Sequence, residues 1–232
     1  MPLLQRPLRA QGLTAARGAV GAPLTVMQLL PALEAGGVER STLEITQALH
    51  RAGHRALVVS AGGRLVPDLE AAGGIHVPLD IGRKSPLTLR HVFSLRRLIE
   101  QHRPDIVHAR SRLPAWIGWW ALRGLRGRKP AFVTTVHGLN SVSGYSAIMT
   151  RGQRVICVSE TVRQYVLANY PNVDPARLTV IERGVDAADF PRGYRADEAW
   201  RETFLAEHPM LAGRPWLVLP GRGTRLKGHA EA

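Results

Sequence analysis

The stretch "RPDIVHARSRLPAWIGWWALRGLRGRKPAFVTTVHG" (residues 103–138) contains two short apolar segments separated by one helix-length segment. Residues 105–111 and 131–138 are apolar on both faces, as is typical of strands buried inside a parallel sheet. The segment between them carries three tryptophans, which would share one face of a helix: Trp116, Trp119 and Trp120. This order predicts two neighbouring parallel strands joined by a crossover helix.

The same alternation recurs along the chain. In residues 37–53, four side chains share one face at near-helical spacing: Val38, Thr42, Ile45 and Leu49. Six further strand-like segments occupy residues 24–30, 55–61, 75–80, 154–160, 177–184 and 215–221. The repetition predicts an α/β fold, with a doubly wound, Rossmann-like parallel sheet and helices on both of its faces.

The pattern divides the chain into four parts. The first carries three arginines and no acid, which interrupts any signal-peptide core, so we expect a disordered extension. The second holds seven strands and forms a complete domain, and the third is a polar connector with one helix predicted over 197–208. The fourth begins a second domain with the eighth strand. Their bounds are 1–22, 23–186, 187–214 and 215–232.

Composition indicates a folded protein of a reducing compartment. Hydrophobic residues make up 45% of the chain, which is enough for a core. The single cysteine, Cys157, excludes a disulfide within the chain, and we expect it to be buried. No apolar run approaches the roughly 18 residues of a membrane-spanning helix. We therefore expect a cytoplasmic localisation.

Positive charge is concentrated in one part of the sequence. Of the net charge of +13, residues 83–129 carry +10, from twelve basic and two acidic residues. Arginines and one lysine follow the three tryptophans, a composition typical of a lipid headgroup interface, so we expect peripheral docking on the inner face of an anionic membrane. In the alternative interpretation the tryptophans pack on the sheet, and the arginines reflect a GC-rich genome. No DNA- or RNA-binding motif accompanies the charge, so no nucleic-acid partner is expected.

Candidate ligand-binding residues follow the strands, because ligands of an open parallel sheet gather at the carboxyl ends of its strands. Gly36 and Gly37 precede a helix, whose free amide groups favour an anion or a sugar hydroxyl. His108 and His137 end the strands of the opening stretch, where an imidazole can bind a hydroxyl or a phosphate. The turn is not G-x-G-x-x-G and no acid closes the second strand, which disfavours a nicotinamide-dependent oxidoreductase.

The last turn of the chain, "GRGTRLKG" (221–228), places Arg222 and Lys227 five residues apart. A planar guanidinium and a mobile ammonium at this spacing could hold one diphosphate from two sides. A solvated basic tail is the alternative interpretation.

Six motifs in order resemble the amino-terminal half of the family-4 retaining glycosyltransferases of the GT-B fold. Within that family the chain most resembles enzymes that build bacterial lipopolysaccharide or related envelope glycans. The motifs are "LEAGGVERSTLEITQAL" (33–49), "RPDIVHARS" (103–111), "VTTVHG" (133–138), "VICVSE" (155–160), "VIERGVD" (180–186) and "PGRGTRLKGH" (220–229).

The resemblance implies two facing Rossmann-like domains, the first binding mainly the acceptor, a glycan or a lipid-linked glycan, and the second mainly a nucleotide-sugar donor. Gly36 and Gly37 match the family's glycine loop near the donor phosphates and the acceptor, and His137 matches the histidine near the transferred sugar. Arg222 and Lys227 match the pair that holds the donor diphosphate and stabilises the leaving group. The resemblance further implies no metal and no cofactor, and a front-face mechanism through an oxocarbenium-like transition state.

The family's "E-x(7)-E" segment, which grasps the nucleotide, is expected beyond residue 232. The resemblance therefore predicts that the chain ends early in the second domain, where transfer would be impaired. A non-catalytic domain that still holds a glycan is the alternative function.

Overall fold

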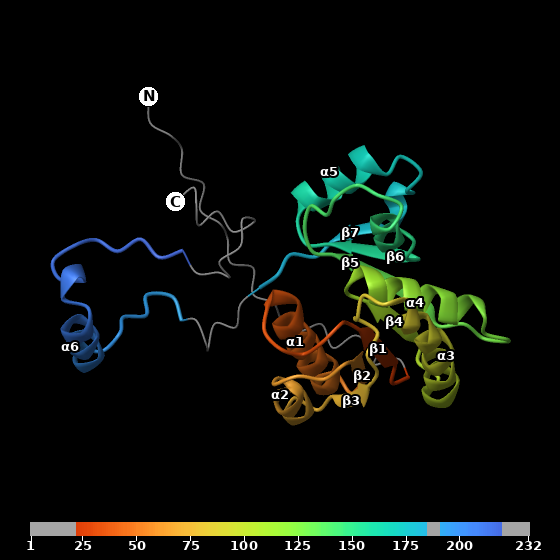
Figure 1. The fold of residues 1–232 in the computed structure, drawn as a ribbon, viewed down its shortest axis with the longest axis horizontal. Coiled ribbons are helices and arrows are strands. Elements are labelled where there is room, and N and C mark those ends of the chain that lie inside the picture. Colours follow the sequence, from red (N-terminus) through yellow and green to blue (C-terminus); the bar gives the residue numbers. More distant parts are fainter. Residues whose placement is uncertain (1–21, 185–190, 220–232) are drawn as a thin grey trace. The chain divides into compact units, whose positions relative to one another are not determined.

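The computed structural model describes residues 22–184 and 191–219, and the chain divides into two compact units, Met1–Arg183 and Gly184–Ala232. The first unit contains one seven-stranded sheet, and every strand pair in it is parallel (Figure 1). Its strands are β1 (Thr25–Leu29), β2 (Arg55–Ser60), β3 (Ile75–Pro78), β4 (Ile106–Ala109), β5 (Ala131–Val136), β6 (Arg154–Cys157) and β7 (Leu178–Val180). The prediction of a doubly wound α/β sheet is confirmed.

The strand order is β3-β2-β1-β4-β5-β6-β7, so the chain reverses direction across the sheet between β3 and β4. β1 lies at the point of reversal and pairs with β2 on one side and with β4 on the other. Loops that leave β1 and β4 therefore diverge at the carboxyl edge of the sheet and leave a crevice where ligands of such folds bind.

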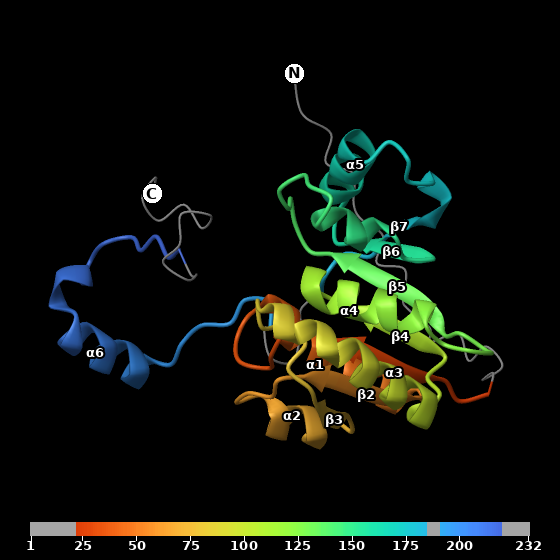
Figure 2. The same cartoon turned by 45° about the vertical axis from the view of Figure 1, so that its right-hand side comes forward.

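Helices connect the strands of this unit. They are α1 (Gly37–Arg51), α2 (Val66–Ala71), α3 (His91–His102), α4 (Arg112–Arg123) and α5 (Glu160–Asn169), with 3-10 turns η1 (Pro86–Arg90), η2 (Ser146–Thr150) and η3 (Pro175–Arg177). Helices α3 and α4 lie side by side (Figures 1 and 2). No helix among the described residues is long and apolar enough to span a bilayer.

Two apolar clusters show that helices cover both faces of the sheet. The larger joins α3 and α4 to sheet residues such as Met27 and Val107, both fully buried. The smaller joins Val58 to Leu69 of α2 and to Leu43 of α1. Strands covered on both faces must be apolar on both, which is the pattern in the sequence.

The second unit contains α6 (Glu198–Glu207), as predicted over 197–208, and the turn η4 (Pro209–Leu211). Trp200 stacks on Phe204 at 5.1 Å, and Phe204 also contacts Trp216, at 5.2 Å between ring centroids. Residues 215–219, predicted to begin the eighth strand, form no strand, because the described part of this unit contains no other strand with which they could pair. Leu217 is fully exposed there.

Candidate functional site at the carboxyl edge of the sheet

Helix α1 begins at the predicted Gly36–Gly37 turn. Gly36 has φ 145° and is the N-terminal cap, and no side chain caps the first turn. The uncapped amides of the first turn are free to donate to an oxygen of a ligand. A cavity of about 330 Å³ adjoins this turn and is lined by Glu34, Ala35, Gly36, Gly37, Arg40, Arg64 and Leu65.

His108, at the end of β4, is 6% exposed. Its Nε2 lies 2.7 Å from Oγ1 of Thr135 on the neighbouring strand β5. Burial, with a smaller contribution from the charge of Arg110, lowers the pKa of His108 from 6.5 to about 3. The ring is therefore neutral at pH 7, and its hydrogen bond joins β4 to β5 behind the crevice.

His137 directly follows β5 and contacts Arg183, whose Nη2 lies 2.5 Å from His137 Nδ1. A guanidinium only donates, so Nδ1 accepts and the proton of the neutral ring is on Nε2. Burial, followed by the charges of Arg110, Arg183 and His108, lowers the pKa of His137 from 6.5 to about 3. Nε2 is buried and has no hydrogen-bond partner among the described residues. The site thus holds an unused N–H donor.

Arg183 connects this histidine to helix α1. Its Nη1 donates to the carbonyl oxygen of Gly37 at 2.8 Å, while its Nη2 donates to His137. Gly37 leaves room for this contact, since a Cβ there would lie 2.7 Å from Arg183 Nη1. The glycine turn, the end of β5 and the segment after β7 therefore meet through one guanidinium.

Arg110 is the least expected member of the group, because it is a cation only 3% exposed. Its guanidinium donates to Gln28 Oε1 at 3.1 Å and to Ser41 Oγ, and its Nε has no partner among the described residues. None of the ion pairs of the described residues involves Arg110. Burial lowers its pKa from 12.5 to about 10, so it remains charged at pH 7. Two guanidiniums and a helix amino terminus thus bring positive charge to this edge, which Glu39 and Glu44 partly offset at Arg110.

The structure brings four predicted residues, Gly36, Gly37, His108 and His137, to one edge of the sheet. Arg222 and Lys227 lie outside the described residues. Sequence reasoning missed two members of the site, Arg110 and Arg183. Arg110 lies two residues after His108 in the motif "RPDIVHARS", and Arg183 lies in the motif "VIERGVD". The presence of each arginine within a motif was therefore the only feature of the sequence that could have indicated a role in the site.

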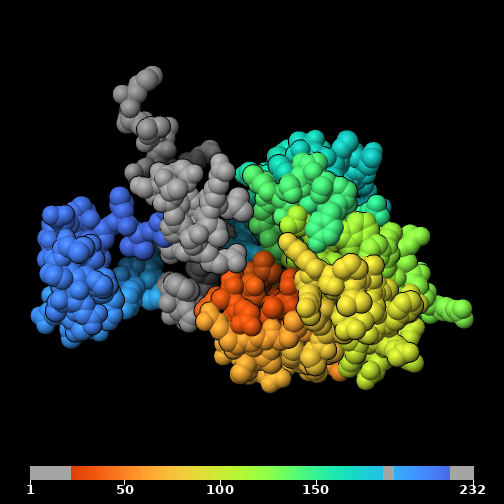
Figure 3. All heavy atoms as spheres, in the orientation of Figure 1, coloured from red at the N-terminus to blue at the C-terminus, as the bar shows by residue number. Residues whose placement is uncertain are grey.

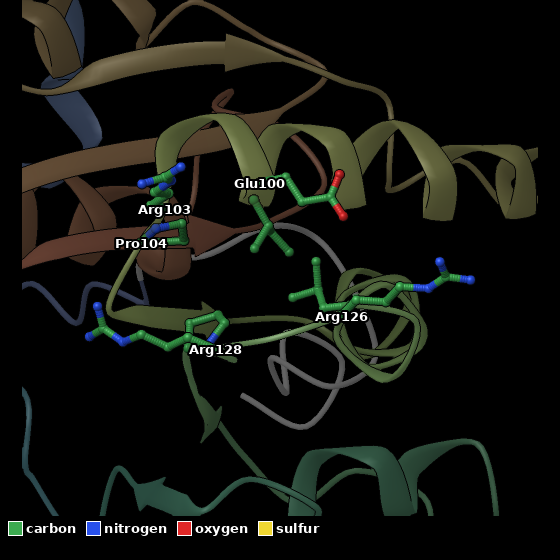
Figure 4. A pocket seen from close by; sticks show the side chains of 8 residues that line it. Glu100, Arg103, Pro104, Arg126 and Arg128 are labelled. Atoms are coloured by element: carbon green, nitrogen blue, oxygen red, sulfur yellow. The ribbon is translucent and has the colours of Figure 1, made fainter.

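Another cavity, of about 520 Å³, lies at the opposite edge of the sheet, before β4 and β5 (Figure 4). It is lined by Ile99, Glu100, Arg103, Pro104, Leu125, Arg126, Arg128 and Pro130. The side chains of Arg126 and Arg128 point to opposite sides in Figure 4, and Arg128 pairs with Asp105 at 2.7 Å. These cations do not converge on one ligand, so the carboxyl edge is the better candidate site.

Comparison with known proteins gives consistent matches. The model of Glycosyltransferase Family 4 matches residues 35–189, which include Gly36, Gly37, His108, Arg110, His137 and Arg183. A crystal structure of a glycosyltransferase from Rickettsia africae is 32% identical, with a TM-score of 0.74 over 90% of this chain and 56% of that one. This chain thus spans little more than half the length of that relative.

Two further matches are more limited. An alpha-maltose-1-phosphate synthase of Mycolicibacterium smegmatis is 40% identical over 77 residues, which are 33% of this chain and 19% of the synthase. Anabaena HepE, solved in complex with UDP-glucose, is 16% identical, with a TM-score of 0.60 over 82% of this chain and 50% of HepE, and shares the fold. The family model matches most of the length of this chain, and the matched residues include most of the parallel sheet described above. The chain therefore belongs to glycosyltransferase family 4.

Proposed function

We propose that this chain is the acceptor-side domain of a retaining glycosyltransferase that moves a sugar from a nucleotide-sugar to a glycan or lipid-linked acceptor of the bacterial cell envelope. The observation that carries the proposal is the buried Nε2–H of His137, which has no partner among the described residues, on a ring that Arg183 joins to Gly37 at the uncapped start of α1. A donor in this position can bind a sugar hydroxyl, and the amides of α1 can bind an anionic or hydroxyl oxygen.

The charge state of His137 suits transfer through a cationic sugar. Positive charge develops on the sugar ring as the glycosidic bond breaks in an oxocarbenium-like transition state. A charged imidazolium beside the sugar ring would destabilise this positive charge. The His137 imidazole, with a pKa of about 3, is neutral at pH 7 and still donates one hydrogen bond. Arg183 holds this ring in one tautomer.

The leaving diphosphate needs positive charge of its own. By their match to the family's motif, Arg222 and Lys227 are proposed to supply it without a metal or a cofactor. In a protein that also carries the second domain, Arg222→Ala and Lys227→Ala should each raise the barrier to transfer by about 2–4 kcal/mol. A chelator should leave transfer unchanged, and wild-type turnover in both variants would remove this assignment.

Thermal denaturation of a protein that also carries the second domain tests the proposal, with a panel of nucleotide-sugars, UDP-glucose among them, because that domain is expected to bind most of the donor. We expect stabilisation by one nucleotide-sugar, amounting to about 2.7 kcal/mol at a hundredfold excess over its Kd. His137→Ala should abolish the shift, while His137→Gln, which keeps an N–H donor, should retain part of it. Substituting the exposed His50 by Ala is the matched control.

A second outcome would favour the alternative function. Stabilisation by a glycan, with none by any nucleotide-sugar, would indicate a glycan-binding domain without transfer activity. A shift that persists unchanged in His137→Ala would contradict the role given to Nε2.

A further inference from the structure

The turn η1 and the start of α3 leave large apolar side chains in solvent. Leu87 is 70% exposed, Leu89 48% and Phe93 64%. The buried face of the same segment is already satisfied, since Thr88, Leu95 and Ile99 are each at most 3% exposed. The segment is thus apolar both on the face that packs against the core and on the face exposed to solvent. Figure 3 shows this segment, in yellow, on the surface of the molecule.

The patch extends onto α4 through Arg96. The guanidinium of Arg96 lies 5.5 Å from the ring centroid of Phe93. It also lies against Gly124, where any Cβ would overlap it. Trp120 is one helical turn before Gly124, on the same face of α4, and is 38% exposed. Arg96 therefore joins Phe93, at the start of α3, to the end of α4, and Trp120 lies against Trp116, at 5.1 Å between ring centroids.

We call this the α3–α4 surface. Its apolar members are Leu87, Leu89, Phe93 and Trp120, and its exposed cations are Arg83, Lys84, Arg90 and Arg97. None of the ion pairs of the described residues engages these cations. Two acids lie close to these cations in the sequence: Glu100, and Asp80, whose Oδ1 accepts from the backbone N–H of Arg83 at 3.2 Å. The charge of this surface is therefore free to meet an external anion.

The other tryptophans expected at a membrane are used within the fold. Trp116 donates from Nε1 to the carbonyl oxygen of Tyr145 at 3.0 Å, and Trp116 and Trp119 are half-buried against the core. Arg128, also expected to face the membrane, pairs with Asp105. The predicted tryptophan cluster thus mostly packs, as the alternative interpretation had it, and the exposed apolar side chains lie on η1 and α3 instead.

We propose that the α3–α4 surface docks on an anionic lipid bilayer, with Leu87, Leu89 and Phe93 entering the headgroup region. A bilayer is favoured by protruding aliphatic and aromatic side chains ringed by unpaired cations, which is the composition of interfacial membrane anchors. A single-stranded nucleic acid would stack its bases on flat, clustered aromatic rings. Leu87 and Leu89 have no aromatic ring, so this surface suits a bilayer better than a nucleic acid. η1 and the start of α3 follow the carboxyl end of β3, so the apolar part of this surface lies on the same side of the sheet as His137 and the start of α1.

Vesicle sedimentation of the full chain tests this. We expect binding to phosphatidylcholine vesicles that contain about a third phosphatidylglycerol, and weaker binding in high salt. The double variant Arg90→Gln, Arg97→Gln should bind about thirtyfold more weakly, and Phe93→Ser about tenfold. Matched controls, which should change binding less than about twofold, are Arg51→Gln with Arg201→Gln for charge and Val142→Ser for exposed apolar area.

All substituted side chains are exposed, so unchanged thermal denaturation would show that the variants fold. Equal binding to pure phosphatidylcholine, or equal loss of binding in the control variants, would overturn the proposal. The absence of vesicle binding would also overturn the proposal. It would do so equally if single-stranded RNA bound instead, with the salt dependence expected here for lipid.

Discussion

Lowering the pH from 7 to 5 should destabilise the folded chain through its two imidazoles of lowered pKa, His108 and His137, and substitution of His108, the more buried of the two, isolates its contribution. The pKa of the His108 ring is about 3 in the folded protein, because it is buried beside Arg110, and 6.5 when it is free in water. A depressed pKa in the folded state means that the unfolded chain takes up the proton first as the pH falls. Folding is therefore penalised progressively from about pH 6.5 down to about pH 3, and by a constant amount below that.

The size of the penalty follows from these two values. At pH 5 the unfolded imidazole is almost fully protonated and the folded one is almost fully neutral, so the difference is about 1.5 pH units, or about 2 kcal/mol. Since His108 is only 6% exposed, solvent screens this difference little. The contribution is large against the roughly 5–15 kcal/mol that stabilises an ordinary domain.

Urea denaturation at pH 7 and pH 5, for the wild type and His108→Gln, measures the effect. Glutamine is close in size and can still bond to Thr135, but it does not titrate. The loss of unfolding free energy between the two pH values should be smaller by about 2 kcal/mol in the variant. His50→Gln, at an exposed position of α1, is the control. If His108→Gln loses as much stability as the wild type, the ring is not held neutral and the account of the site fails.

Three further outcomes are expected. Arg110→Met should raise the pKa of His137, because the charge of Arg110 is among the causes that lower it. NMR titration of the His137 ring measures this pKa, and a pKa that stays at about 3 in the variant would contradict the expectation. Gly152→Ala should cost about 1–3 kcal/mol in urea denaturation, since its Cβ would overlap the carbonyl oxygen of Arg154, which cannot rotate away. Cys157 is fully buried, and burial raises the pKa of its thiol to about 11, so only about a thousandth of it would be thiolate at pH 8. A thiol reagent should therefore react with Cys157 only as the chain unfolds. Rapid labelling of the native protein would contradict the burial of this side chain.

The sheet and part of the site could be predicted from the sequence because both depend on local pattern. Apolar segments of strand length located the seven strands, and parallel strands bring their carboxyl ends to one edge. This is why Gly36, His108 and His137, each next to a strand end or a helix start, could be grouped from their positions in the sequence alone.

The contacts of Arg183 could not be predicted in the same way. It reaches Gly37 across 146 positions and His137 across 46, and only the path of the chain after β7 brings it there. The burial of Arg110 was equally hidden, because arginine is ordinarily a surface residue. Its place depends on two neutral oxygens, from Gln28 and Ser41, that become its partners only when β1, α1 and β4 have packed.

The position of β1 at the point where the strand order reverses also bears on how the protein is synthesised. As the nascent chain leaves the ribosome, β1, β2 and β3 can already pair, since they lie within the first 78 residues. The other side of β1 stays open until β4, residues Ile106–Ala109, has emerged and crossed back. During that interval the growing chain presents an unpaired apolar strand, the kind of edge on which chains aggregate. Pairing with β4 covers this edge of β1 only after some eighty further residues have been made, and β5, β6 and β7 then extend the open sheet from β4.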